Sequence, residues 1–162
     1  MLSYLSQFWA EDCDTVAKRT SPVPTERERE QMVNPTGDGA VLFVGVVGGR
    51  IVGMLQAAIL QGSEFQHNCQ FGISVLASHR GQGIGRALLE KLLEWAEAQS
   101  LWRVELEVQS ANARGIGLYS SMGFVQDGRR ENAVRLRDGR YRDLIHMYRY
   151  TAVATRALQG AQ

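Results

Sequence analysis

The sequence has few of the residues that build disulfide scaffolds and metal sites. Its 162 residues include two cysteines, Cys13 and Cys69, and three histidines, His67, His79 and His146. Two cysteines outside any motif exclude a disulfide framework and a zinc site of the usual spacing. Three scattered histidines argue against a histidine-rich metal centre. We therefore predict that the protein holds no metal and works in the reducing cytoplasm.

The sequence also lacks an excess of charge of either sign and has no long apolar run. Eighteen Lys and Arg residues face 17 Asp and Glu residues, which leaves a formal net charge of +1. Such a balance indicates neither a nucleic acid nor a membrane surface as a partner. No apolar run approaches the ~20 residues that a membrane span needs. The hydrophobic fraction of 44% is ordinary for a soluble domain.

From residue 40 onward, β-rich runs alternate with segments of helical periodicity. Gly48-Gly49 separates two such runs, 40–47 and 50–57, and predicts a hairpin with a two-residue turn. Apolar positions recur at helical spacing between residues 83 and 99. Asn112 suits an N-cap and Gly123 the residue after a helix, so a second helix is expected between them. Further strands are expected at 69–77, at 101–109, and in a last hairpin with segments 124–125, 133–137 and 141–150.

These elements predict one mixed α/β domain over residues 1–162, with a twisted mixed sheet and helices on both faces. The strand–helix–strand order from 69 to 109 predicts a right-handed crossover. Residues 1–39 are expected to be a helical N-terminal part, with helices near 8–18 and 26–32. Residues 151–162 are expected to be a frayed tail.

A glycine-rich turn joins the expected strand ending at Ala77 to the helix that follows. Gly81, Gly83 and Gly85 lack the Cβ atoms that would keep a ligand from the backbone. The start of the helix offers free N–H groups and a partial positive charge, which favour phosphate oxygens. A P-loop would need Lys-Ser/Thr after Gly85, and a dinucleotide fingerprint starting at Gly81 would need glycine where Arg86 stands.

Two motifs carry a resemblance to a known family. Arg80-x-x-Gly83-x-Gly85 resembles the acetyl-CoA loop of the GCN5-related N-acetyltransferases (GNAT superfamily). The stretch from Asn112 through Leu118-Tyr119 to Gly123-Phe124 resembles the second signature of that superfamily, N-x-x-A-x-x-L-Y-x-x-x-G-F. The resemblance covers roughly residues 40–150. The sequence departs from the family's pattern at Gly115, where the family usually has alanine.

The resemblance implies an arrangement of the acetyl-CoA site. Backbone groups of residues 73–75 would hold the pantetheine arm as an added strand, and the loop would wrap the pyrophosphate. Asn112 would contact the arm, and Tyr119 would lie beside the thioester sulfur as the acid that protonates the leaving thiolate. The implied cofactor-binding set is Ile73, Ser74, Val75, Arg80, Gly81, Gln82, Gly83, Ile84, Gly85, Arg86, Asn112 and Tyr119.

The sequence indicates the general base less clearly than the acetyl-CoA site. Strand alternation puts Glu105 and Glu107 on one side, with Trp102, Val104, Leu106 and Val108 on the other. Glu107, within Leu106-Glu107-Val108, matches the glutamate that ribosomal-protein alanine acetyltransferases of this superfamily use as a base. A solvated strand face bearing two acids is the competing interpretation. Glu64, His67 and His146 are alternative bases that could act through water.

Arginines crowd the last hairpin. Alternation would place part of this charge on an exposed edge, which explains it without a ligand. An acceptor that carries a carboxylate is the functional alternative, because a guanidinium matches a carboxylate well. The arginines are Arg129, Arg130, Arg135, Arg137, Arg140, Arg142 and Arg149.

The sequence therefore predicts an acetyl-CoA-dependent N-acetyltransferase that acts on a primary amine of a small molecule or a protein N-terminus. The amine would attack directly, because neither cysteine has a histidine partner. The expected partners are acetyl-CoA and the amine acceptor, and a homodimer is left open. A non-catalytic acyl-CoA-binding or sensor domain is the main alternative. A Rossmann-type nucleotide binder is third, because the glycine spacing opposes it.

Overall fold

The computed structural model describes residues 2–10, 39–136 and 138–160. The part of the predicted helix near 8–18 that follows Ala10, and the whole of the one near 26–32, lie outside these ranges. The elements, in chain order, are α1 (Leu2–Ala10), β1 (Ala40–Val47), β2 (Arg50–Ile59), β3 (Asn68–Val75), a 3-10 turn η1 (Ala77–His79), α3 (Ile84–Ala98), β4 (Arg103–Gln109), α4 (Ala113–Ser121), β5 (Val125–Arg135), β6 (Tyr141–Tyr150) and α5 (Ala152–Gly160).

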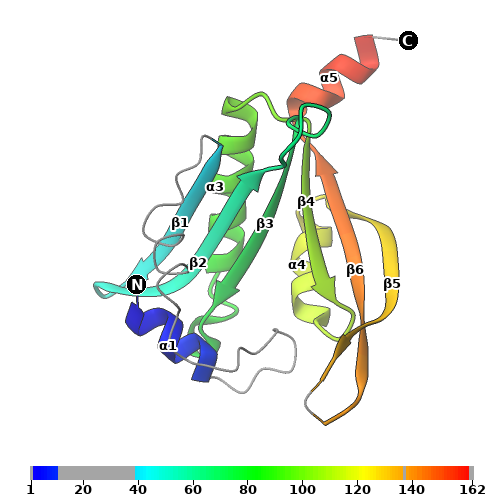
Figure 1. The fold of residues 1–162 in the computed structure, drawn as a ribbon. Coiled ribbons are helices and arrows are strands. Elements are labelled where there is room, and N and C mark those ends of the chain that lie inside the picture. The colour runs from blue at the N-terminus through cyan, green and yellow to red at the C-terminus, as the bar shows by residue number, and fades with distance from the viewer. Residues whose placement is uncertain (1, 11–38, 137, 161–162) are drawn as a thin grey trace.

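The six described strands form one mixed sheet in the order β1-β2-β3-β4-β6-β5 (Figure 1). Only β3 and β4 run parallel, and α3 connects them. The turn between β1 and β2 has φ values of +55° at Gly48 and +75° at Gly49. Two consecutive positive φ values are typical of the hairpin turn that matches strand twist. The predicted mixed α/β fold is confirmed.

Helices lie against both faces of the sheet. α3 approaches β1 and β2 closely, because a Cβ on Gly45 or Gly53 would lie 2.9 Å from Cγ2 of Ile84. α1 packs on the opposite face, where Tyr4 and Leu5 join a second buried cluster with strand residues of β2. The Tyr4 hydroxyl lies 3.0 Å from the Ser74 carbonyl oxygen and donates a hydrogen bond to it. This contact ties α1 to β3.

The parallel pairing of β3 with β4 is short. It joins residues 68–70 to residues 103–105, and beyond them the two strands continue unpaired with one another. The Leu76 N–H bonds the Val52 carbonyl of β2, which makes these two residues a hydrogen-bonded pair. Alternation along β3 therefore turns the N–H and C=O groups of Ile73 and Val75 toward the β4 side. The sheet splits at this point and exposes strand backbone.

Three features differ from the sequence-based prediction. Residues 152–160 form helix α5 instead of a frayed tail, because Thr151 is buried and its Oγ1 caps the helix at the Ala154 N–H, 3.3 Å away. Trp102 precedes β4 and is 36% exposed, so it does not belong to the core side of that strand. β5 runs continuously over 125–135, where two short segments were expected. Its pairing with β6 has two register shifts, one between Gln126 and Gly128 and one between Arg130 and Val134.

Candidate functional site

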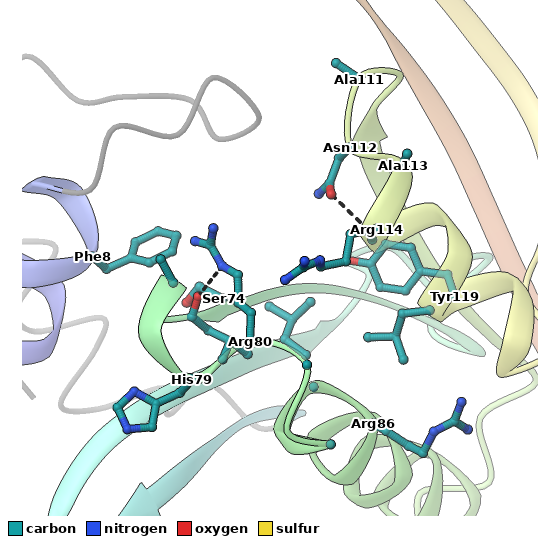
Figure 2. Close-up of a pocket in the computed structure, with 18 residues that line it drawn as sticks. Phe8, Ser74, His79, Arg80, Arg86, Ala111, Asn112, Ala113, Arg114 and Tyr119 are labelled. Carbon is teal, nitrogen blue, oxygen red and sulfur yellow. Dashed lines mark hydrogen bonds between the residues drawn. The ribbon is translucent and has the colours of Figure 1, made fainter.

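A pocket of about 970 Å³ lies at the split between β3 and β4 (Figure 2). Its walls come from the end of β3, the glycine-rich loop, the first turn of α3, the start of α4, and Phe8 of α1. Among its described lining residues are three arginines, Arg80, Arg86 and Arg114, and no aspartate or glutamate. A cleft lined by one sign of charge favours a ligand of the other sign. The pocket is therefore suited to an anion.

The glycines of the loop have two different roles. Gly81 has a φ of +80° and Gly83 a φ of +83°, and a Cβ on either would project into open space. Gly83 is also the N-cap of α3, so the free N–H groups of the first helical turn lie beside it. Gly85, in contrast, allows α3 to approach α4, because its Cβ would lie 3.0 Å from Cδ2 of Leu118. Gly81 and Gly83 form the part that fits a pyrophosphate.

Arg80 and Arg86 hold the loop as well as lining the pocket. Arg80 Nε donates to the Val75 carbonyl oxygen at 2.9 Å, which closes the loop onto the end of β3. Arg86 reaches the end of α4, where it donates to Ser121 Oγ at 2.8 Å and to Met122 Sδ at 3.0 Å. Both arginines thus contribute to the pocket wall, and no aspartate or glutamate is among the described lining residues.

Ten of the twelve predicted cofactor-binding residues line the pocket. Gln82 does not, since its side chain is exposed and donates to the Ser78 carbonyl oxygen at 3.2 Å. The Ile84 side chain packs on the sheet and not on the pocket. Arg114 also lines the pocket and was not predicted, although its position two residues after a helix N-cap could have indicated it. The ten residues are Ile73, Ser74, Val75, Arg80, Gly81, Gly83, Gly85, Arg86, Asn112 and Tyr119.

Tyr119 extends from α4 into the pocket toward β3 (Figure 2). The residue is 7% exposed, and its ring makes edge contacts with Phe71 and Phe124, with centroids 6.0 and 6.1 Å away. Burial raises the pKa of Tyr119 to about 12 because the phenolate would lose its hydration. The phenol therefore keeps its proton throughout the neutral pH range.

Asn112 caps α4, and Gly115 makes the cap fit. Asn112 Oδ1 accepts a hydrogen bond from the Gly115 N–H at 2.9 Å. A Cβ on residue 115 would lie 2.7 Å from Asn112 Nδ2. The departure from the family pattern at Gly115 thus gives the Asn112 side chain room at the pocket wall.

Glu107 lies outside the pocket lining, on the open face of β4. Its Oε1 accepts from Arg130 of β5 at 2.5 Å, and its side chain is 33% exposed. Glu105, on the same face, accepts from Arg103 at 2.8 Å and lies 3.1 Å from His146 Nε2. Glu105 is the more enclosed of the two carboxylates and has two partners.

His146 belongs to an ionic cluster on that face. It lies between Glu105 and Asp127, and Arg103 bonds both carboxylates. The hydrogen bond from Arg103 holds the pKa of Asp127 below its usual range. The two other alternative bases, Glu64 and His67, precede the first residue of β3. Since a strand rises ~3.3 Å per residue, His67 is on the order of 20 Å from the pocket residue Ile73.

None of the described helices is long and apolar enough to cross a bilayer. No group of three or more His, Cys, Asp or Glu side chains in the described ranges could hold a metal ion. Cys69 is buried, and desolvation, aided by Glu105, raises the pKa of its thiol to about 12. Cys69 is therefore unsuited to be a nucleophile.

The split sheet and its cationic pocket define an α/β domain for a phosphate-bearing ligand, and comparison with known proteins identifies the class further. The model of the acetyltransferase (GNAT) family matches residues 6–124. The chain belongs to this family, as its two motifs predicted.

Individual relatives fit the same class. The chain is 41% identical over 70 residues to the ribosomal protein bS18-alanine N-acetyltransferase of Escherichia coli K12, which covers 43% of this chain and 47% of that protein. The chain thus spans about half the length of the curated relatives that it matches. A GNAT acetyltransferase structure from Streptococcus pneumoniae superposes with a TM-score of 0.83 at 24% identity, covering 92% of this chain and 90% of that one. YncA of Salmonella typhimurium, solved with acetyl-CoA, gives a TM-score of 0.65 at 23% identity over 76% and 68% of the two chains.

Proposed function

We propose that the protein transfers the acetyl group of acetyl-CoA to a primary amine. The observation that carries this proposal is the pocket itself, which runs from the glycine loop at the start of α3 to the buried phenol of Tyr119. One end suits a pyrophosphate and the other holds a proton donor. Family membership supports the reaction type, and the relatives' printed names give the amine as acceptor for those proteins.

Acetyl-CoA fits the residues that are present. Its phosphates would lie at Gly81, Gly83 and the first turn of α3, where a Cβ on either glycine would meet no neighbouring atom and where arginines are among the pocket residues. Its pantetheine arm would pair with the groups of Ile73 and Val75 that face the split between β3 and β4. Alternation turns the Ser74 backbone toward β2, and its side chain lies 2.9 Å from the Tyr4 hydroxyl, so Ser74 serves as a wall of the pocket.

Tyr119 is the proposed acid. Acetyl transfer leaves a thiolate on the donor, and a phenol beside it can supply a proton as the carbon–sulfur bond breaks. The raised pKa ensures that the phenol is protonated when the reaction begins. Direct attack by the amine is proposed because the buried thiol of Cys69 is unsuited to a covalent intermediate.

Glu107 is the proposed base. Its one partner among the described residues is Arg130, whose side chain is 63% exposed. An exposed ion pair contributes about 0–1 kcal/mol, so Arg130 can swing away at little cost. The carboxylate could then accept a proton from the ammonium form of the acceptor, directly or through water. Glu105 is held by two partners and is the weaker candidate.

The experiment is to mix the protein with acetyl-CoA and a panel of primary amines and to measure free CoA. We expect CoA release that depends on the amine and an acetylated product with one added acetyl group. Calorimetry with acetyl-CoA, NAD and ATP is the binding control, and only acetyl-CoA is expected to bind tightly. Tight acetyl-CoA binding without release on any amine would support a sensor domain instead. Cytoplasmic location and dimer formation stay predictions.

A further inference from the structure

Helix α4 carries Tyr119, but its own sequence holds it only weakly. The helix has nine residues, Ala113–Ser121, which is fewer than the ~12–15 that an isolated helix needs to be even marginally stable. Two of the nine are Gly115 and Gly117, and glycine is the least favourable residue in a helix interior after proline. Contacts with the rest of the fold therefore fix the position of α4, and with it the position of the proposed acid.

An arginine of α3 holds the end of α4. Arg86 lies in the first turn of α3, and both of its terminal nitrogens donate to α4 and its C-cap. Nη2 donates to Ser121 Oγ at 2.8 Å, and Nη1 donates to Met122 Sδ at 3.0 Å. Ser121 Oγ in turn donates to the Leu118 carbonyl oxygen at 2.7 Å, in the last turn of the helix. Figure 2 shows the Arg86 side chain pointing away from Arg80.

The end of α4 is a place where a cation is stabilising, because the C-terminal end of a helix carries partial negative charge. A second arginine, Arg149 of β6, donates to the carbonyl oxygen of the same C-cap residue, Met122. The Met122 N–H bonds the Tyr119 carbonyl oxygen at 3.0 Å. The turn that Arg86 holds is thus joined directly to the backbone of Tyr119.

Resting on the acetyl transfer proposed above, we infer that Arg86 is a positioning residue, which holds the end of α4 against α3 and keeps the Tyr119 hydroxyl at the pocket. The resemblance places Arg86 among the cofactor-binding residues, whereas its hydrogen bonds join it to the helix that carries the acid. A phosphate ligand stabilises the bound donor. A positioning residue acts when the carbon–sulfur bond breaks, because Tyr119 must then deliver its proton. Loss of Arg86 therefore lowers turnover and leaves the donor bound.

The first measurement separates turnover from donor affinity. Arg86→Met keeps the apolar stem and removes both hydrogen bonds. We expect kcat at saturating acetyl-CoA to fall about tenfold, and the Kd for acetyl-CoA, by calorimetry, to stay within about threefold of the parent's. Arg86→Lys, which keeps the charge without the planar fork, should recover part of the loss. A Kd raised about tenfold with kcat unchanged would identify a phosphate ligand and overturn the inference.

Ser121 tests the same contact from outside the pocket, since it is not among the described lining residues. Ser121→Ala should lower kcat about threefold and Ser121→Thr should restore it. In the double variant with Arg86→Met the two losses should be less than additive, because both residues belong to one hydrogen bond. Ser120→Ala, one residue earlier and also exposed, is the matched control and should leave kcat unchanged. Fully additive losses would overturn the inference.

The ionisation of Tyr119 reports its position without any acceptor. Near pH 11 a pKa of about 12 leaves most of this phenol protonated, and the ultraviolet absorbance of the phenolate measures the ionised fraction, with Tyr119→Phe as the blank. Arg86→Met should raise that fraction, because water that reaches the ring lowers the pKa toward 10.0. Loss of a cation would by itself raise the pKa, so the expected change can only come from hydration of the ring.

The two readouts distinguish failure of the inference from failure of the proposed reaction. An unchanged or smaller ionised fraction in folded Arg86→Met would overturn the inference even if kcat fell, because the phenol would then have kept its buried place. A larger fraction in a protein that acetylates no amine would support the inference while the proposed reaction fails. Urea unfolding at the same pH confirms that the variant is folded.

Discussion

Tyr119→Phe is the sharpest test of the proposed reaction, because it removes one proton and very little else. The ring of Tyr119 packs edge-on against Phe71 and Phe124, and a phenylalanine keeps both contacts. The hydroxyl is the part that faces the pocket. Loss of a general acid typically lowers turnover about 10²–10⁴-fold, which corresponds to about 3–5 kcal/mol in the activation barrier. Stability at neutral pH is expected to change by less than about 1 kcal/mol.

Alkaline pH supplies a second, independent readout. Burial raises the pKa of Tyr119 from 10.0 to about 12, so the folded protein holds this proton more tightly than the unfolded chain. The stability that this raised pKa contributes to the folded protein is fully present below pH 10 and is lost as the pH rises toward 12. The difference between a pKa of 10.0 and one of about 12 corresponds to about 2.7 kcal/mol of unfolding free energy, which is the upper bound of that loss. Tyr119→Phe should lack this share of the alkaline destabilisation.

Urea unfolding at pH 8 and near pH 11 measures the stabilities, and CoA release measures turnover. Tyr141→Phe is the matched control, because Tyr141 is 53% exposed and lies on the last hairpin, outside the pocket. It should alter neither turnover nor the alkaline loss. If Tyr119→Phe turned over within twofold of the parent, the thiolate would leave unaided or take its proton from water, and the assigned role would be wrong.

Three further changes test other parts of the structure. Gly83→Val puts a β-branched residue at a φ of +83° on the pocket wall and should weaken acetyl-CoA at least about tenfold by calorimetry; unchanged affinity in a folded variant would refute the loop assignment. Glu107→Gln should lower turnover at neutral pH and recover in part at higher pH, with Glu105→Gln less affected; an unaltered pH–rate profile would move the base elsewhere. Thr151→Val removes the 2.6 Å hydrogen bond to the Leu101 carbonyl and the cap of α5, so urea unfolding should show a loss of about 1–3 kcal/mol, and no loss would contradict the proposed anchoring.

Local rules predicted the elements that local chemistry determines. The Gly48-Gly49 turn has the two positive φ values that only glycines adopt readily. Asn112 caps α4 as its side chain indicated, and Gly123, with a φ of +84°, follows the helix end. In each case a few neighbouring residues carry the whole physical reason. The predicted boundaries therefore agree with the observed ones to within a residue or two.

Tertiary contacts determined what the sequence could not show. Helix α5 depends on Thr151 reaching the Leu101 carbonyl and on Ala154 entering a buried site, and neither partner is near in sequence. The pairing of Glu107 with Arg130 depends on β6 lying between β4 and β5 in the sheet. The sequence predicted Glu107 as a base and indicated the arginine-rich hairpin. It did not predict that Arg130 of this hairpin pairs with Glu107.

Charged side chains are arranged differently in the pocket and on the open face of β4. Arginines at residues 80, 86 and 114 line the pocket, where no described lining residue is acidic. Glu105, Glu107 and Asp127 lie on β4 and β5, where Arg103 and Arg130 pair with them. An anionic donor is thus attracted to the pocket, whereas the paired arginines neutralise much of the acidic charge on the open face of β4. Opening the exposed pair between Glu107 and Arg130 is therefore the step that would free a carboxylate for the proposed base.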